Sequence, residues 1–167
     1  MSKIKIISVQ EEELTVVHQL AEKIWPEVYD YMISQAQIRY MLDAMYSLKS
    51  LRTQLKNGHE FLLLLHDDTP MGFCSFQQLD AERFRLQKLY VSKNGHGKGW
   101  GYLLLHTIEQ KIKSRNGKVL ELNVNRNNRS LAFYQRQGFQ IVRSEDIDIG
   151  NGFFMNDFVM EKKLTLE

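Results

Sequence analysis

The stretch Gly95-His96-Gly97-Lys98-Gly99-Trp100-Gly101 places a glycine at every second position. It follows a strand-like run at residues 84–91 and precedes an amphipathic helix that begins near Trp100. Glycines let a ligand approach the backbone closely, and the free N–H groups at the start of a helix favour a bound anion. We therefore expect this loop to hold a phosphorylated ligand.

The spacing of the glycines argues against two other phosphate-binding loops. A P-loop has Ser or Thr after its lysine, whereas Gly99 follows Lys98 here. A dinucleotide-binding G-x-G-x-x-G loop would need glycine at position 100 or 102, and both positions hold large aromatic residues. The remaining pattern is x-G-x-G-x-G. Such a pattern could also form a flexible turn that binds no ligand.

The strand before the loop changes its alternation partway along. Its inward apolar positions are first even-numbered and then odd-numbered: Phe84, Leu86, Leu89 and Val91. Such a slip, near residues 87–88, is typical of a β-bulge. A strand that is buried on both faces would blur the alternation as well.

A second motif covers residues 127–139 and has the pattern N-x-x-S-x-x-x-Y-x-x-x-G-F. Taken singly, its residues have ordinary interpretations, because Asn127 could cap a helix, Tyr134 could be a core residue and Gly138 could end the helix. Two motifs in this order, separated by one predicted helix and one predicted strand, are a much more specific signal than either alone.

Together the two motifs resemble the signature of the GCN5-related N-acetyltransferase (GNAT) family, Q/R-x-x-G-x-G/A followed by N-x-x-A/S-x-x-x-Y. This resemblance implies an α/β (α+β) fold, with a mixed central sheet of bulged, splayed parallel strands flanked by helices. One departure is visible, because His96 stands where the family usually has Gln or Arg. Residues 147–164 are loosely similar to the C-terminal hairpin of bacterial spermidine/spermine-type N-acetyltransferases.

The resemblance implies that acetyl-CoA is the cofactor and indicates which residues contact it. The loop amides would hold the pyrophosphate, and Asn127 would contact the pantetheine amide. Tyr134 is the expected catalytic residue, with its hydroxyl beside the departing sulfur, while a backbone N–H near Leu89 or Tyr90 would stabilise the oxyanion. The expected cofactor-binding residues are Leu89, Tyr90, Val91, His96, Gly97, Lys98, Gly99, Trp100, Gly101, Asn127, Ser130, Tyr134 and Arg136.

The acceptor site is expected in the connector between the first two predicted helices. Aromatic rings beside carboxylates suit a cationic amine, although a hydrophobic staple between helices would use the same rings. The candidate substrate residues are Trp25, Glu27, Tyr29 and Tyr31. An alkylammonium has a pKa of about 10.4, so it must lose a proton before it attacks, and no residue stands out as the base.

The composition is that of one globular domain. The resemblance implies that this is a single N-acetyltransferase domain over residues 1–167. Hydrophobic residues make up 43% of the chain, and the dispersed charges sum to +2, too little to indicate nucleic acid. No apolar run reaches the roughly 20 residues of a membrane span, and the N-terminus is unlike a secretory signal. We therefore expect no membrane association and a cytoplasmic location.

Cysteine and histidine usage adds two further expectations. The single cysteine, Cys74, lies in an apolar run and is expected to be a buried thiol rather than a nucleophile. The five histidines show no metal-ligand spacing, so no metal is expected.

Periodicity and turn signals predict the order of the elements. We expect strands at residues 3–9, 60–66, 71–79, 84–91 and 119–124, and two further strands joined by residues 150–152. Helices are expected at residues 11–24, 34–45, 48–55, 99–114 and 128–137, with Ser34 and Gln37 forming a capping box at the start of the second.

The resemblance implies an N-acetyltransferase, and because Cys74 is not expected to be a nucleophile, we expect a primary amine to attack acetyl-CoA directly in a ternary complex. The amine would belong to a small molecule such as a polyamine, or to a peptide. The alternative is a module that binds acyl-CoA without turnover. A homodimer contact through the C-terminal hairpin is also expected, formed by Phe153, Phe154 and Phe158.

Overall fold

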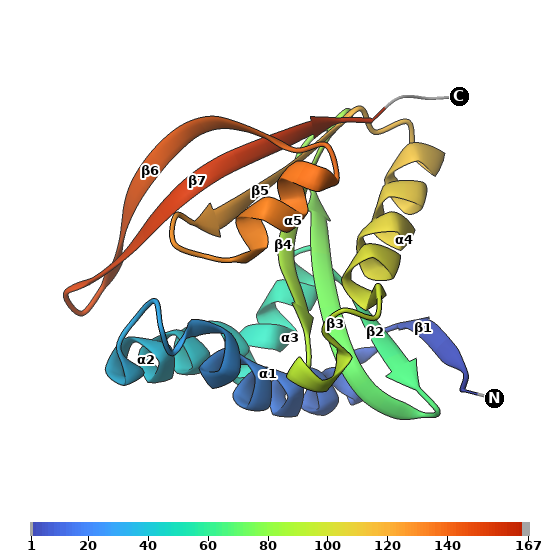
Figure 1. Cartoon of the computed structure of the whole chain (residues 1–167). Coiled ribbons are helices and arrows are strands. Elements are labelled where there is room, and N and C mark those ends of the chain that lie inside the picture. Colours follow the sequence, from blue (N-terminus) through green and yellow to red (C-terminus); the bar gives the residue numbers. More distant parts are fainter. Residues whose placement is uncertain (1, 165–167) are drawn as a thin grey trace. The chain divides into compact units, whose positions relative to one another are not determined.

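The computed structural model describes residues 2–164, in which the helices and strands follow the predicted order (Figure 1). The strands are β1 (Ile4–Ser8), β2 (Glu60–His66), β3 (Thr69–Gln78), β4 (Arg83–Val91), β5 (Val119–Asn125), β6 (Gln140–Gly150) and β7 (Phe153–Lys163). The α-helices are α1 (Leu14–Tyr29), α2 (Gln35–Tyr46), α3 (Leu48–Lys56), α4 (Trp100–Ser114) and α5 (Ser130–Arg136). Two 3-10 turns, η1 (Glu11–Glu13) and η2 (Lys93–Gly95), precede α1 and α4.

The strands form a mixed sheet, as the sequence predicts. Their hydrogen-bonded order is β1-β2-β3-β4-β5-β7-β6. β4 and β5 run parallel, in a register from Arg83 opposite Val119 to Leu86 opposite Leu122. β1 and β2, β2 and β3, β5 and β7, and β6 and β7 are antiparallel pairs.

Contacts between residues divide the chain into two compact units. The first unit comprises Met1–Gln77 and Lys88–Ile108, and the second comprises Gln78–Gln87 and Glu109–Glu167. The chain passes between the units at the end of β3, within β4 and within α4. The expectation of a single domain over residues 1–167 stays a prediction.

In the first unit, α1 runs further than the sequence predicts. The helix continues through Pro26 to Tyr29, so the expected connector at residues 25–31 is mostly helical. A proline inside a helix costs about 3 kcal/mol. Burial of the Trp25 and Tyr29 rings, each worth roughly 1.5–3 kcal/mol, offsets that cost. Packing between distant segments therefore overrides the local signal for a helix end.

β4 also differs from its predicted burial pattern. Its buried positions are Phe84, Leu86 and Lys88. Leu89 and Val91, which were expected to face inward, are half-buried. Lys88 is buried because its side chain lies against the rings of Tyr46 in α2 and Phe61 in β2, a contact that the pattern of one strand cannot reveal.

Two backbone hydrogen bonds bear on the bulge predicted in β4. The Ser92 N–H donates to the Met71 carbonyl at 2.7 Å, and the Leu79 N–H donates to the Arg83 carbonyl at 2.9 Å. Along the β3 side these bonds are eight residues apart, and along the β4 side they are nine residues apart. One extra residue on the β4 side is the count that a β-bulge produces.

In the second unit, β6 and β7 form a long hairpin that pairs with β5 through β7 (Figure 1). One face of β5 is apolar, because Leu120, Leu122 and Val124 are all buried. Gly117, before β5, permits a close approach of side chains, since a Cβ there would lie 2.3 Å from the Ile112 side chain. The opposite face of this part of the sheet is polar.

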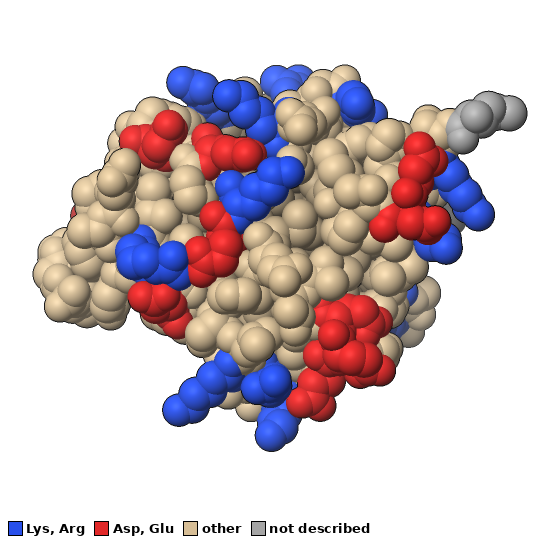
Figure 2. Space-filling model, turned by 90° about the horizontal axis from the view of Figure 1, so that it is seen from below, with Lys and Arg blue, Asp and Glu red and all other residues tan. Residues whose placement is uncertain are grey.

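Charged side chains of both signs are interspersed on the face of the molecule drawn in Figure 2. None of the helices within residues 2–164 combines the length and the apolar composition of a bilayer-spanning helix.

Candidate functional site

The glycine-rich loop presents unpaired backbone amides. Gly97 has a φ of +80° and Gly99 a φ of +79°, and a Cβ built on either would have no neighbouring atom within 4 Å. In the described part of the chain, neither amide donates to a backbone carbonyl. Both lie just before the first turn of α4, whose N-terminal amides carry partial positive charge. The exposed loop thus fits a pyrophosphate group.

His96 has a structural role in this loop. Its Nε2 lies 2.9 Å from the carbonyl oxygen of Val91, a distance at which the ring donates a hydrogen bond to the end of β4. Position 95 has no room for a side chain, because a Cβ on Gly95 would lie 2.3 Å from the ring of Trp100. The departure from Gln or Arg at position 96 therefore leaves a side chain that ties the loop to β4.

The remaining predicted loop residues lie at the start of α4. Trp100 is buried, with its ring centre 5.2 Å from that of His66. The Lys98 ammonium lies 5.2 Å from the centre of the Trp100 ring, and Gly101 occupies the first turn of α4. The exposed Lys98 is therefore available for an anion, whereas Trp100 packs the loop against His66 at the end of β2.

The end of β4 carries three predicted cofactor residues, Leu89, Tyr90 and Val91, and all are half-buried. The Tyr90 hydroxyl lies 2.8 Å from the hydroxyl of Tyr29. β3 approaches closely here, because a Cβ on Gly72 would lie 2.9 Å from the carbonyl oxygen of Tyr90.

Two of the candidate substrate residues lie in the core of the first unit. The Trp25 ring is packed against the rings of Tyr29, Tyr46 and Tyr90, with centres 4.3, 5.4 and 5.7 Å away. Trp25 is 2% exposed and Tyr29 is 6% exposed. In this arrangement the face of Trp25 is not open to an amine, and its contact with substrate stays a prediction.

The other two candidate substrate residues are exposed. The Glu27 carboxylate accepts a hydrogen bond from the Lys93 N–H at 3.3 Å, which links α1 to η2. Tyr31 lies beyond the end of α1 and is 43% exposed. Glu27 and Tyr31 therefore remain accessible for an acceptor.

In the second unit, the turn after β5 is organised by asparagines. The Asn125 side chain accepts from the Asn127 N–H at 2.9 Å, and the Asn128 side chain accepts from the Ser130 N–H at 2.8 Å. The Asn128 side chain thus satisfies the first amide of α5, whose N-cap residue is Arg129. The exposed Asn127 side chain makes no hydrogen bond within residues 2–164, which leaves its amide available for a ligand.

α5 carries the other predicted residues of this motif. Tyr134 is 8% exposed, and its ring makes edge contacts with Phe133 and Phe139, whose ring centres lie 5.3 and 5.7 Å away. Ser130 is half-buried at the start of the helix, and Arg136 is exposed in its last turn. Within the second unit, the fold therefore brings Asn127, Ser130 and Tyr134 to one turn and helix.

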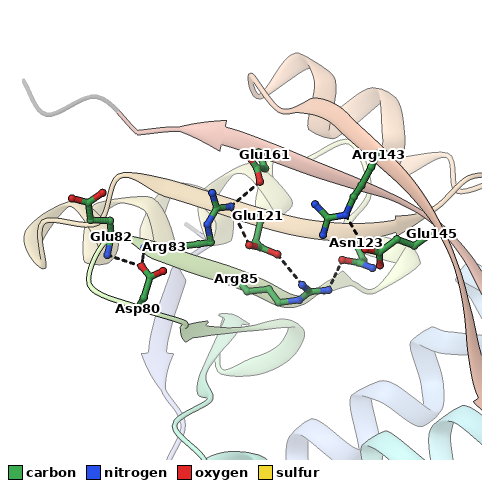
Figure 3. A network of polar contacts seen from close by, with 9 residues as sticks. All are labelled: Asp80, Glu82, Arg83, Arg85, Glu121, Asn123, Arg143, Glu145 and Glu161. Atoms are coloured by element: carbon green, nitrogen blue, oxygen red, sulfur yellow. Dashed lines mark hydrogen bonds and ion pairs between the residues drawn. The ribbon is translucent and has the colours of Figure 1, made fainter.

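The polar face of the second unit carries a network of ion pairs (Figure 3). Arg83 in β4 contacts Glu121 in β5 at 3.1 Å and Glu161 in β7 at 2.7 Å. Arg85 contacts the other oxygen of Glu121 at 2.9 Å and hydrogen-bonds to Asn123. The paired charges offset the cost of burying Glu121.

One carboxyl on this face is incompletely bonded. Asp157 in β7 is 2% exposed, and its Oδ2 accepts from the Asn123 amide at 3.4 Å. Its Oδ1 is buried without a hydrogen bond among the described residues. Burial raises the pKa of Asp157, with a further rise from the charge of Glu145. Perturbed carboxyls of this kind are common at functional sites.

Lys88 was missed by the sequence reasoning, although its position in phase with the apolar Phe84 and Leu86 is a signal for it. Its side chain is 8% exposed, and burial lowers its pKa to about 8. Cys74 is buried as expected, and burial raises the pKa of its thiol, which disfavours a thiolate nucleophile. No cluster of three or more His, Cys, Asp or Glu within residues 2–164 is placed to hold a metal ion.

Comparison with known proteins agrees with this fold. Residues 29–162 match the family described as the acetyltransferase (GNAT) domain. No curated protein sequence matches the chain.

Several solved structures share the fold. The PaiA N-acetyltransferase of Thermoplasma acidophilum, solved in complex with coenzyme A, is 27% identical, with a TM-score of 0.82 and coverage of 96% of this chain and 99% of that one. A GCN5-related N-acetyltransferase of Rhodopseudomonas palustris has 19% identity, a TM-score of 0.83 and coverage of 98% of each chain. The ribosomal-protein-S18-alanine N-acetyltransferase of Escherichia coli has 15% identity, a TM-score of 0.76 and coverage of 99% and 96%.

The loop geometry predicts the effect of a charge at Gly99. Gly99→Asp adds a carboxylate where phosphate is expected and should abolish the rise in Tm that acetyl-CoA gives the wild type. Gly58→Asp is the matched control, because Gly58 also has a positive φ, +92°, and open space around its Cβ position. Thermal denaturation with and without acetyl-CoA measures both. An unchanged shift in a folded Gly99→Asp protein would contradict the assignment.

Burial of Lys88 predicts a pH-dependent effect on stability. An unfolded lysine has a pKa of about 10.4, so folding desolvates the charge below pH 8 and releases a proton between pH 8 and 10. Lys88→Met should therefore raise the Tm at pH 7, by about 2–4 °C for each kcal/mol of desolvation removed. The gain should shrink at pH 9.5. The exposed Lys5→Met is the control, and a gain independent of pH would refute this account.

Proposed function

The chain belongs to the GNAT acetyltransferase family and uses acetyl-CoA, and we propose that it transfers the acetyl group to a primary amine of a small molecule or a peptide. The observation that carries this proposal is the glycine loop, where the amides of Gly97 and Gly99 donate to no backbone carbonyl of the described chain and a Cβ on either residue would have no atom within 4 Å. The free side chain of Asn127 supports it in the second unit.

Acetyl-CoA supplies an activated acetyl thioester when bound. We assign its pyrophosphate to the amides of residues 97–101, with Lys98 adding a positive charge and His96 holding the loop on β4. The pantetheine arm is assigned to the backbone of Leu89, Tyr90 and Val91 and to the side chain of Asn127. Ser130 and Arg136 complete this set on α5.

The acceptor amine attacks the acetyl carbon in its neutral form, in a complex with both substrates. A C–N bond forms and the C–S bond breaks, while the amine loses one proton and the departing sulfur gains one. Tyr134 is the proposed donor of a hydrogen bond or proton to that sulfur, and the backbone N–H of Leu89 or Tyr90 is the proposed donor to the carbonyl oxygen. Cys74 takes no part, since burial raises its pKa.

Glu27 and Tyr31 are the proposed acceptor contacts, because they are exposed near the end of α1. A carboxylate and an aromatic ring attract a cationic amine before it is deprotonated. We propose that Tyr29 and Trp25 support the acceptor site indirectly. The Tyr29 hydroxyl is hydrogen-bonded to that of Tyr90, and the Trp25 ring packs against both tyrosine rings.

An amine panel tests the proposed reaction. Polyamines, aminoglycosides, amino acids and peptides are incubated with acetyl-CoA, and free thiol is followed with a chromogenic disulfide. Thiol release that depends on one class of amine supports the proposal. Binding of acetyl-CoA without thiol release in any member would instead favour a module that binds acyl-CoA without turnover.

Tyr134→Phe separates a catalyst from a structural tyrosine. If the hydroxyl assists departure of the thiolate, turnover should fall roughly 10- to 10³-fold while acetyl-CoA binding stays nearly unchanged. Steady-state kinetics and thermal shift measure the two effects, with Tyr40→Phe on α2 as the control. Turnover within about twofold of wild type would remove Tyr134 from the catalytic role.

Dimerisation through the C-terminal hairpin is also proposed. Phe154 in β7 is 50% exposed, whereas Phe153 and Phe158 are half-buried. Light scattering should give twice the chain mass of 19.7 kDa, and Phe154→Ser should shift it toward the monomer value. A wild-type mass at the monomer value would refute the dimer.

A further inference from the structure

Three polar side chains lie among apolar residues of β2, β3 and β4 in the first unit: His59 just before β2, Ser75 in β3 and Lys88 in β4. Phe61 in β2 is directly opposite Ser75 in β3, so the two side chains lie on one face of the sheet. His59 precedes Phe61 by two residues, and the Lys88 side chain reaches over the Phe61 ring from β4. His59, Ser75 and Lys88 therefore surround the same phenylalanine.

These three groups lack partners. The Lys88 ammonium lies 5.2 Å from the centre of the Tyr46 ring and 5.9 Å from that of Phe61. Within residues 2–164 it makes no ion pair or hydrogen bond, and Lys88 is only 8% exposed. The Ser75 hydroxyl and the His59 Nδ1 are likewise buried without a hydrogen bond in the described chain.

Several half-buried cations in the second unit pair with carboxylates. Lys162, for example, pairs with Glu109 at 2.9 Å in the second unit. Among the described residues, the Lys88 ammonium contacts aromatic ring faces instead of a carboxylate. Ring faces favour the charged form of a lysine, but they do not replace the hydrogen bonds that its three N–H groups would donate. Groups of this kind are costly unless a ligand satisfies them.

The chemistry of the three groups favours an anion. Lys88 carries a positive charge and only donors, and the Ser75 hydroxyl can donate. Burial, and next the charge of Lys88, lower the pKa of His59, so its ring is neutral and can donate from Nδ1. A positive charge with adjacent hydrogen-bond donors matches the two oxygens of a carboxylate.

The position of Lys88 in β4 indicates which ligand supplies this carboxylate. The phosphates of acetyl-CoA are assigned to the glycine loop, beyond the far end of β4. Lys88 directly precedes Leu89 and Tyr90, which are assigned to the thioester end of the cofactor. An anion at Lys88 therefore lies near the reacting group and belongs to the acceptor.

We propose that Lys88, Ser75 and His59 bind a carboxylate of the acceptor, so that the preferred substrates are amines carrying a carboxylate, such as amino acids, rather than polyamines. This inference rests on the proposed acetyl transfer to an amine. Lys88 acts as a specificity-determining residue, and the rings of Tyr46 and Phe61 hold its ammonium in place.

Matched acceptor pairs test the proposal. Lysine and cadaverine differ only by the carboxylate, as do ornithine and putrescine, so the ratio of their kcat/KM values isolates its contribution. In the wild type each amino acid should exceed its diamine by at least about 10-fold. Lys88→Met should remove most of this preference while changing the diamine rate by less than about threefold. Ser75→Ala should reduce the preference by a smaller factor, and Lys5→Met should leave it intact.

The outcomes separate this proposal from the proposed function. Thiol release with either member of a pair supports acetyl transfer, and the ratio alone decides the carboxylate site. Equal rates within wild-type pairs, faster diamines, or an unchanged ratio in folded Lys88→Met would each overturn it.

A binding measurement decides the matter if no acceptor in the pairs is acetylated. In the presence of coenzyme A, N-acetylglycine should raise the Tm of the wild type, whereas N-acetylglycinamide should not. Lys88→Met should lose the response to N-acetylglycine and keep the response to acetyl-CoA. Equal shifts with the acid and the amide would refute the carboxylate site independently of turnover.

Discussion

The backbone of β4 needs hydrogen-bond partners along its length, and this requirement positions much of the candidate site. At residues 83–86 the strand pairs with β5. At its other end, the Ser92 N–H bonds to Met71, and the His96 ring bonds to the Val91 carbonyl. These bonds hold the glycine loop at the end of β4. The amides of Gly97 and Gly99, which no strand or helix uses, are the groups left for a ligand.

The burial of Lys88 opposes stability. An ammonium taken out of water without a counter-charge costs on the order of several kcal/mol, and an apolar side chain of similar size would avoid that cost. Proteins retain such destabilising buried charges mainly where function requires them. In the second unit, by contrast, the buried carboxylate of Glu121 is paired with Arg83 and Arg85.

Much of the fold follows from local signals. The Ser34 hydroxyl accepts from the Gln37 N–H at 3.0 Å and begins α2 where the sequence places it. Gly150 and Gly152 have positive φ values and join β6 to β7. The glycine loop and the Asn127 turn also lie between the predicted elements, since helix starts and turns depend on residues only a few positions apart.

Only the tertiary structure decided which side chains are covered. The sequence by itself determined the family motifs and the element order, because these depend on spacing along the chain. It did not determine that α1 passes through Pro26, that Trp25 packs against Tyr46 and Tyr90, or that Lys88 is buried against the ring of Phe61. Those outcomes depend on rings and strands far apart in sequence, and burial is a property of their packing rather than of any one segment.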